Sequence, residues 1–302
     1  DAIKQDRADM QAEVDERVHS LDERLDAEQT DAIPRTSEGH PDLNGVWQVL
    51  TAASWNILDH NAQKGVPPGQ GIVDGNEIPY TPEARAIQQE NYENREARDP
   101  VNQCYLPGVP RIMYMPFPFR INQSEYLTAL TFEYNHAYRW IYTDGSEHPE
   151  ALEFWMADSR GQWEGDTLVV SVADFNDQTW FDAAGNFHSE EMRLTERYTM
   201  RGPNHIDYEV TVEDPSIFTQ PWVMRTVLYR RLEEAVQTLD YECLEFEEPF
   251  LSWDAVPSPE VVGTMHGVQD PGEVHRGDLA DGSFLDGGLE RGGDFAGGCR
   301  LT

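Results

Sequence analysis

From residue 111 to residue 246 the chain is a series of short strand-like segments separated by turn signals, and this pattern constrains the fold most. Asp144-Gly145 and Ala184-Gly185 mark two of the turns. Many short strands joined in this way are typical of antiparallel sandwiches and barrels. No alternation of strands with helices appears, which disfavours a parallel sheet. The expected strands are 111–115, 119–124, 126–134, 137–143, 153–157, 166–174, 191–201, 205–214, 222–232 and 237–246.

The segment before these strands adds two elements. A first strand is expected from Asp42 onward, and its Gly45-x-Trp47 pattern is one that lipocalin-type barrels use to plug a closed end. A helix is expected at about 81–98, because Thr81 can cap it and a proline at the first turn suits a helix start. The predicted fold class is therefore mainly β, either an antiparallel barrel of calycin or lipocalin type or a two-sheet sandwich.

The two ends of the chain differ from this body. Residues 1–30 are highly charged with apolar residues every three to four positions, which predicts an amphipathic helix. The C-terminal segment is rich in glycine and acidic residues, a composition typical of a disordered tail or linker. We expect a helix and linker over 1–41, one β-rich domain over 42–252 and a long irregular tail over 253–302. Either end could join copies of the chain into a homo-oligomer.

The net charge of -34 limits the partners of this protein. So acidic a surface repels nucleic acid and anionic lipid, which excludes a nucleic-acid-binding function. It favours solubility and fits a salty habitat. The sequence holds no run of 18 apolar residues, so no membrane-spanning helix is expected.

The three cysteines are Cys104, Cys243 and Cys299. None forms a CxxC pair, so neither a zinc knuckle nor a thioredoxin-like site is expected. In an exported protein a Cys104–Cys243 disulfide would leave Cys299 unpaired.

Glu196 is the candidate catalytic residue of the strand 191–201, because alternation places it on an otherwise apolar face. The residues that share this face are Met192, Leu194, Tyr198 and Met200. An unpaired buried carboxylate is costly, so Glu196 needs either a partner or a task. It could act as a general acid or base, or form a structural ion pair with an arginine such as Arg139 or Arg225.

Three histidines are candidates for chemistry. His188 precedes the strand of Glu196, and His148 follows the turn at Asp144-Gly145. We expect Glu196, His188 and His148 to be the catalytic residues, although a loop or capping role is the simpler interpretation of each histidine. No HExxH motif occurs, and no metal is expected. If a metal were bound, His136, His148 and His188 could meet from different strands.

Aromatic residues are dense between Glu133 and Trp222, and a subset that lines a pocket would suit a flat apolar or aromatic ligand. Arg230 lies on an inward strand face, where it could pair with Glu196, anchor an anion or reach solvent. The expected substrate-binding residues are Tyr138, Arg139, Trp140, Asp144, Trp222 and Arg230. The absence of GxSxG, Walker and GxGxxG motifs argues against the usual α/β-hydrolases, NTPases and Rossmann oxidoreductases.

Several stretches between about residues 99 and 246 match a known family. They read DPVNQCYLPGVPR, RWIYTDGSEHP, WEGDTLVVSVADFNDQTWFD, GNFHSEEMRLTERYT, VEDPSIFTQPW and YECLE. Here the chain resembles a large family of uncharacterised bacterial proteins, usually regarded as exported, for which no reaction is established. The shared family positions are Cys104, Arg111, Asp144, His148, Trp163, Asp166, His188, Glu196, Arg197, Glu213, Asp214 and Trp222. Where family members often have Cys-His-Glu, this chain has Cys243-Leu244-Glu245.

Together these features predict a periplasmic or extracellular enzyme without an organic cofactor, acting by acid–base chemistry on a small, largely apolar or aromatic substrate in a barrel pocket. A lyase, an isomerase or a hydrolase would fit. The alternatives are a non-catalytic binding protein for an apolar ligand, a metal-dependent enzyme, and a structural or assembly protein.

Overall fold

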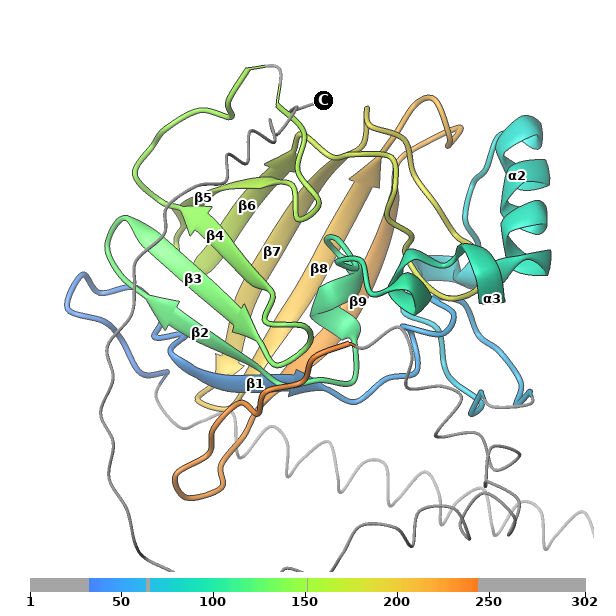
Figure 1. Cartoon of the computed structure of the whole chain (residues 1–302). Helices are drawn as coiled ribbons and strands as arrows, with labels where there is room; N and C mark the ends of the chain where they lie inside the picture. The colour runs from blue at the N-terminus through green and yellow to red at the C-terminus, as the bar shows by residue number, and fades with distance from the viewer. Residues whose placement is uncertain (1–32, 64–65, 151, 244–302) are drawn as a thin grey trace, which may run out of the picture. The chain divides into compact units, whose positions relative to one another are not determined.

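The computed structural model describes residues 33–63, 66–150 and 152–243, and these residues are mainly β (Figure 1). Nine strands close into one barrel in chain order. The strands are β1 Gly45–Val49, β2 Phe119–Gln123, β3 Leu127–Phe132, β4 Tyr138–Tyr142, β5 Asp158–Glu164, β6 Thr167–Ala173, β7 Arg193–Gly202, β8 His205–Glu213 and β9 Trp222–Arg230. This confirms the mainly β prediction and selects the barrel over the sandwich.

One strand pair departs from the expected antiparallel arrangement. All neighbours are antiparallel, including the closing pair of β1 and β9, except β4 and β5, where Ile141 pairs with Ser159 and Tyr142 with Arg160 in parallel. A parallel pair cannot be joined by a tight hairpin and needs a longer crossover. Residues 143–157 form this crossover, which becomes one wall of the candidate site described below.

Two helices and three short 3₁₀ turns complete the described chain: α2 Pro82–Glu93, α3 Arg95–Arg98, η1 Asp74–Asn76, η2 Pro100–Gln103 and η3 Arg111–Tyr114. The hydroxyl of Thr81 accepts from the backbone N–H of Ala84, so this residue caps α2 as predicted. The expected single helix is broken at Asn94, and α2 and α3 lie outside the barrel (Figure 1).

The prediction of strands was wrong in three places. Residues 111–115 lie largely in η3, whose four residues are all buried; a short apolar run does not distinguish a strand from a helical turn. Residues 153–157 and 237–246 contribute only isolated bridges among the described residues. In contrast, β5 was not predicted, because its sequence DSRGQWE is too polar to show alternation.

Trp47 of β1 is fully buried and donates its indole N–H to the carbonyl of Leu43. The guanidinium of Arg230 lies 4.2 Å over the Trp47 ring and donates to the carbonyls of Pro203, Asn44 and Asp42. Gly45 has a φ of +142°, a backbone conformation that side-chain-bearing residues rarely adopt, and a side chain there would also meet this guanidinium; both explain the glycine. Arg230 thus packs on Trp47 and bonds to backbone carbonyls, and its role in substrate binding stays a prediction.

The predicted helix of residues 1–30 and the tail of 253–302 lie outside the described residues. The expected domain boundaries and oligomer contacts therefore stay predictions. No helix within the described ranges is long and apolar enough to cross a membrane.

Candidate functional site

Glu196 lies inside the barrel in a hydrogen-bonded group that we call the inner network. Its members are Arg139 of β4, Ser159 of β5, Glu196 and Tyr198 of β7, and Tyr208 of β8. Arg139 donates to the two carboxylate oxygens of Glu196 at 3.0 and 2.5 Å, and to the hydroxyl of Ser159 at 2.9 and 3.0 Å. The hydroxyl of Tyr208 donates to Glu196 Oε1 at 2.5 Å. The side chains of Arg139 and Glu196 are 1% and 0% exposed.

The inner network explains the carboxylate on an apolar face without a catalytic role. Burial alone would lower the pKa of Arg139, but the adjacent Glu196 carboxylate raises it above its ordinary value. Burial and the same carboxylate also raise the pKa of Tyr208. The ion pair between Glu196 and Arg139, one of the two alternatives for this carboxylate, is confirmed. The acid–base role of Glu196 and the substrate-binding role of Arg139, which is among the residues that line the groove described below, stay predictions.

His188 is also a buried structural residue. Its Nε2 lies 2.7 Å from the hydroxyl of Thr179 and its Nδ1 lies 2.9 Å from the carbonyl oxygen of Ser189. The rings of Phe175 and Phe181 meet the imidazole edge-on. Burial lowers the pKa of His188, so the ring is held in its neutral form. Both ring nitrogens have hydrogen-bond partners and the side chain has almost no access to solvent, so the described contacts give no support to its catalytic role, which stays a prediction.

The remaining predicted residues are dispersed. His136 is exposed and lies 3.9 Å from Asp240, so the proposed set of three metal-binding histidines does not assemble. Trp222 is buried against Phe181 and Phe218.

Asp144 lies in an exposed turn. Its carboxylate accepts from the backbone N–H of Ser146, which is the structural role that an Asp-Gly turn predicts.

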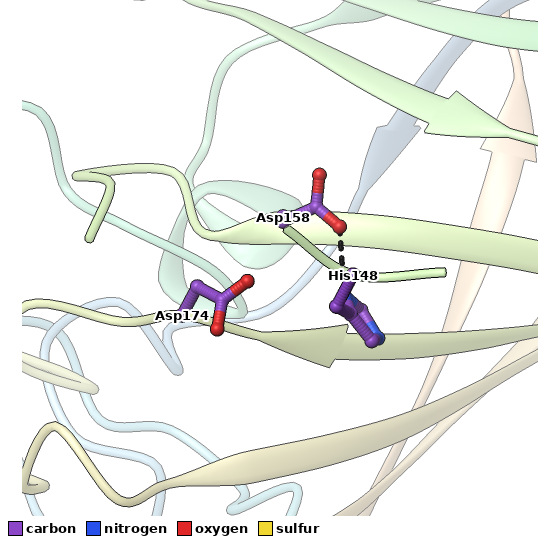
Figure 2. A group of neighbouring side chains, drawn as sticks. All are labelled: His148, Asp158 and Asp174. Atoms are coloured by element: carbon purple, nitrogen blue, oxygen red, sulfur yellow. Dashed lines mark hydrogen bonds and ion pairs between the residues drawn. The ribbon is translucent and has the colours of Figure 1, made fainter. Parts of the chain in front are cut away.

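His148 differs from the other predicted residues because it joins a partly exposed cluster on the outside of the barrel, which we call the outer cluster: His148, Asp158, Arg160, Ser171 and Asp174. Nδ1 of His148 lies 2.7 Å from Oδ2 of Asp158, and Nε2 lies 2.9 Å from the hydroxyl oxygen of Ser171. Figure 2 shows the bond between His148 and Asp158, with Asp174 beside them. The side chain of His148 is 22% exposed.

The strands and the crossover position the outer cluster together. Asp158 and Arg160 alternate onto one face of β5, and the register places Arg160 opposite Ser171 of β6. The crossover brings His148 over this face. Arg160 donates to both oxygens of Asp158, at 2.6 and 2.9 Å, which fixes the carboxylate.

The hydrogen bonds define the tautomer of His148. A carboxylate can only accept, so Nδ1 carries the proton that is donated to Asp158. In the neutral ring Nε2 is then unprotonated, and it accepts from the hydroxyl of Ser171. This is the arrangement in which a histidine can act as a general base.

A pocket with a volume of about 690 Å³, which we call the aromatic groove, adjoins the outer cluster. It lies between the outer face of β4 and the crossover, and its apolar walls include Leu106, Tyr138, Trp140, Leu152, Phe154 and Trp155. Asp158 and Arg160 line the groove as well, as does Pro149, the residue after His148. The groove therefore brings Tyr138 and Trp140, two of the predicted substrate-binding residues, together with Asp158, the hydrogen-bond partner of His148.

Asp174 adds a further carboxylate. One ligand atom each from His148, Asp158 and Asp174 lies within 4.8 Å of the others, a spacing that could hold a metal ion. Oδ2 of Asp174 is buried and has no hydrogen-bond partner among the described residues.

Cys104 and Cys243, the pair singled out in the sequence, form a disulfide with a Cα–Cα distance of 5.4 Å. The bond joins the segment after α3 to the chain beyond β9. Leu244, where this chain departs from the family pattern, lies outside the described residues.

The sequence reasoning missed Asp158, Arg160, Ser171 and Asp174. The signal for two of them was present, because Asp158 and Arg160 flank a single residue and so share a strand face. This sequence signal could not identify the cluster by itself, because the register of β5 and β6 is needed to show that Ser171 lies opposite Arg160.

The chain matches no protein-family model and no curated protein. The family resemblance seen in the sequence therefore stays a prediction.

Proposed function

We propose that this protein is an enzyme that hydrolyses esters of small aromatic or apolar molecules, with the aromatic groove as its binding site and His148 as its acid–base residue. The observation that supports this most is the series of hydrogen bonds from Asp158, which lines the groove, through His148 to Ser171. The sequence left a lyase, an isomerase and a hydrolase open, and this series of hydrogen bonds favours a hydrolase.

The groove has the properties of a small-molecule site. Its volume of about 690 Å³ lies within the usual range for ligand pockets, and its walls are largely apolar. Tyr138 is 57% exposed and Trp140 is 41% exposed, although large aromatic side chains are normally buried. Their exposed faces can stack on a flat ligand, which would remove this apolar surface from water.

The outer cluster provides the acid–base chemistry. Asp158 holds the His148 ring in one orientation and one tautomer, with Nε2 available to take a proton. Two carboxylates, Asp158 and Asp174, lie close to the ring on which positive charge develops when the proton is taken. Opposite charge at that distance stabilises the imidazolium.

The test is the hydrolysis of 4-nitrophenyl butyrate, an ester with an aromatic leaving group. We expect His148→Gln to lower kcat/KM roughly 10²- to 10⁴-fold, the usual contribution of a positioned general base. Trp140→Ala should raise KM more than it lowers kcat, because it removes binding surface and leaves the outer cluster intact.

His205→Gln is the matched control, because His205 lies on β8 and packs edge-on against Tyr229. It should hydrolyse the ester at the wild-type rate. If His148→Gln and His205→Gln are equally active, the proposal is wrong. Retained binding of the ester without any turnover would favour a non-catalytic binding protein instead.

A metal-dependent enzyme is the second candidate, supported by the unpaired buried oxygen of Asp174 beside His148 and Asp158. One nitrogen and two carboxylate oxygens are ligands that Zn²⁺ and Mn²⁺ accept. The two bonds from Arg160 to Asp158 weigh against it, since a cation would have to share that carboxylate with a guanidinium.

Asp174→Asn separates the two candidates. Dialysis against Zn²⁺ or Mn²⁺ followed by elemental analysis should show one ion per chain, lost in this variant, if a metal is bound. If no ion is retained and Asp174→Asn still hydrolyses the ester, the metal candidate is wrong.

Export to the periplasm or the cell exterior is part of the proposal. The disulfide between Cys104 and Cys243 supports it, because such bonds persist mainly in oxidising compartments. Equal stability with and without a reductant such as dithiothreitol would remove this support.

A further inference from the structure

We infer that Ser171 is a nucleophile that forms a covalent acyl-enzyme with the ester. This inference rests on the proposed hydrolase function and specifies how its first step occurs. Ser171 Oγ lies 2.9 Å from Nε2 of His148, which is within reach for direct proton transfer. With Asp158 at 2.7 Å from the other ring nitrogen, the three side chains form the linear arrangement of a nucleophile, a base and an orienting carboxylate.

The position of Ser171 in β6 is unusual for that strand. Six of the seven residues in Thr167–Ala173 are buried or partly buried, and Ser171 alone is exposed. Ser171 presents its hydroxyl to the side on which the crossover places His148. A structural serine would be expected to bond to the backbone, but the described partner of this hydroxyl is an imidazole nitrogen.

The aromatic groove is connected to Ser171 through Arg160. Arg160 lines the groove and is the cross-strand neighbour of Ser171 in the register of β5 and β6. Directly opposed side chains in an antiparallel pair have their Cβ atoms about 5 Å apart. An ester whose aromatic part occupies the groove would therefore present its carbonyl next to Ser171.

The step balances without any further reactant. The Ser171 oxygen adds to the ester carbonyl carbon while its proton moves to Nε2 of His148, which forms a tetrahedral intermediate. The C–O bond to the alcohol then breaks, and the alcohol oxygen takes the proton from His148. Water hydrolyses the acyl-serine by the same route, which releases the acid and restores Ser171.

Arg160 is the cation available to the negative oxygen of the intermediate. One N–H of its Nη1 donates to the hydroxyl of Ser146, and its Nε and one N–H of Nη2 donate to Asp158, which leaves two of the five N–H groups for the substrate. A guanidinium beside the reacting carbonyl can stabilise the developing charge, as donors in an oxyanion hole do. The substrate class that fits is an uncharged carboxylic ester with an aromatic or apolar group.

The experiment is covalent labelling of the full-length protein with a fluorophosphonate, which phosphonylates an activated serine and releases fluoride. Peptide mass spectrometry should locate one added phosphonyl group on Ser171, and His148→Gln should abolish the label. Ser171→Ala should lose the label and lower the hydrolysis of 4-nitrophenyl butyrate on the order of 10³-fold or more. Ser124→Ala is the control, because Ser124 lies in the turn between β2 and β3 and bonds to the backbone; it should label like the wild type.

The outcomes separate this inference from the proposed function. If the wild type is not labelled at Ser171, or if Ser171→Ala keeps most of its activity, Ser171 is not the nucleophile. If Ser171 is not the nucleophile but His148→Gln still abolishes ester hydrolysis, the hydrolase proposal stands and His148 activates water directly. If neither substitution lowers hydrolysis, both proposals fail.

Discussion

The inner network and the outer cluster contain the same kinds of groups in opposite settings. Each has an arginine that donates two bonds to a carboxylate, and each includes hydroxyl groups. The side chains of Arg139 and Glu196 are at most 1% exposed, whereas Arg160 and His148 are 19% and 22% exposed. The inner groups are closed to solvent, and the outer groups adjoin a groove.

The comparison teaches which buried polar groups can do chemistry. Oε1 of Glu196 accepts from Arg139 and Tyr208, and its other oxygen accepts from Arg139, so neither remains open to a substrate. His148 instead presents its unprotonated nitrogen to one exposed hydroxyl. A closed network should contribute to stability, while an accessible base should contribute to activity.

Glu196→Gln should show the largest effect on stability. The substitution leaves Arg139 buried with an uncompensated charge, and breaking such a pair typically costs about 3–5 kcal/mol. We expect the free energy of unfolding in urea to fall by about this amount, or the variant to fail to fold.

Glu164→Gln is the matched control on the surface. Glu164 pairs with Arg197 at 3.2 Å, and both side chains are well exposed. A pair of this kind contributes about 0–1 kcal/mol. If the two variants lose the same stability, the inner network has no special structural role and the comparison fails.

Much of the barrel could be predicted from the sequence, because alternation in the long strands is a direct consequence of one buried face. It correctly placed Glu196 on the inner face of β7. What alternation could not give was the partner, since Arg139 is 57 residues away and reaches Glu196 only when the barrel closes. The same inward position therefore suggested a catalytic role as well as an ion pair, and the structure shows the ion pair.

The outer cluster could not be predicted for a different reason. β5 has a polar sequence because one of its faces lies under the crossover and receives charged partners there. Its strand character was therefore hidden, and the parallel pairing with β4 was missed with it. Without that pairing, nothing in the sequence connects His148 with Ser171.

His188 should show the next largest effect, as a dependence of stability on pH. Burial lowers its pKa in the folded protein below the ordinary value of 6.5, so below that pH the unfolded chain binds a proton that the folded chain does not. Stability from His188 is fully present above about pH 6.5 and is lost as pH falls towards the folded pKa. The slope is at most about 1.4 kcal/mol per pH unit.

The measurement is urea unfolding between about pH 5 and pH 7.5, compared between the wild type and His188→Gln. Asp182 changes the stability with pH in the opposite direction. Burial raises the pKa of Asp182 to about 6, so its contribution to stability increases as the pH falls and this carboxyl is protonated. It is present in both proteins, so the difference in slope reports His188. An identical slope in the two proteins would mean that burial does not lower the pKa of His188 in the folded protein.

The outer cluster should show the smallest effect on stability. His148 is partly exposed and the hydroxyl of Ser171 is accessible, so His148→Gln and Ser171→Ala should change the free energy of unfolding by less than about 1 kcal/mol. The same two substitutions are expected to give the largest losses of ester hydrolysis. If either substitution lowers the free energy of unfolding as much as Glu196→Gln does, the outer cluster is a second structural network. Polar groups that must contact a substrate cannot at the same time be the groups that hold the barrel together.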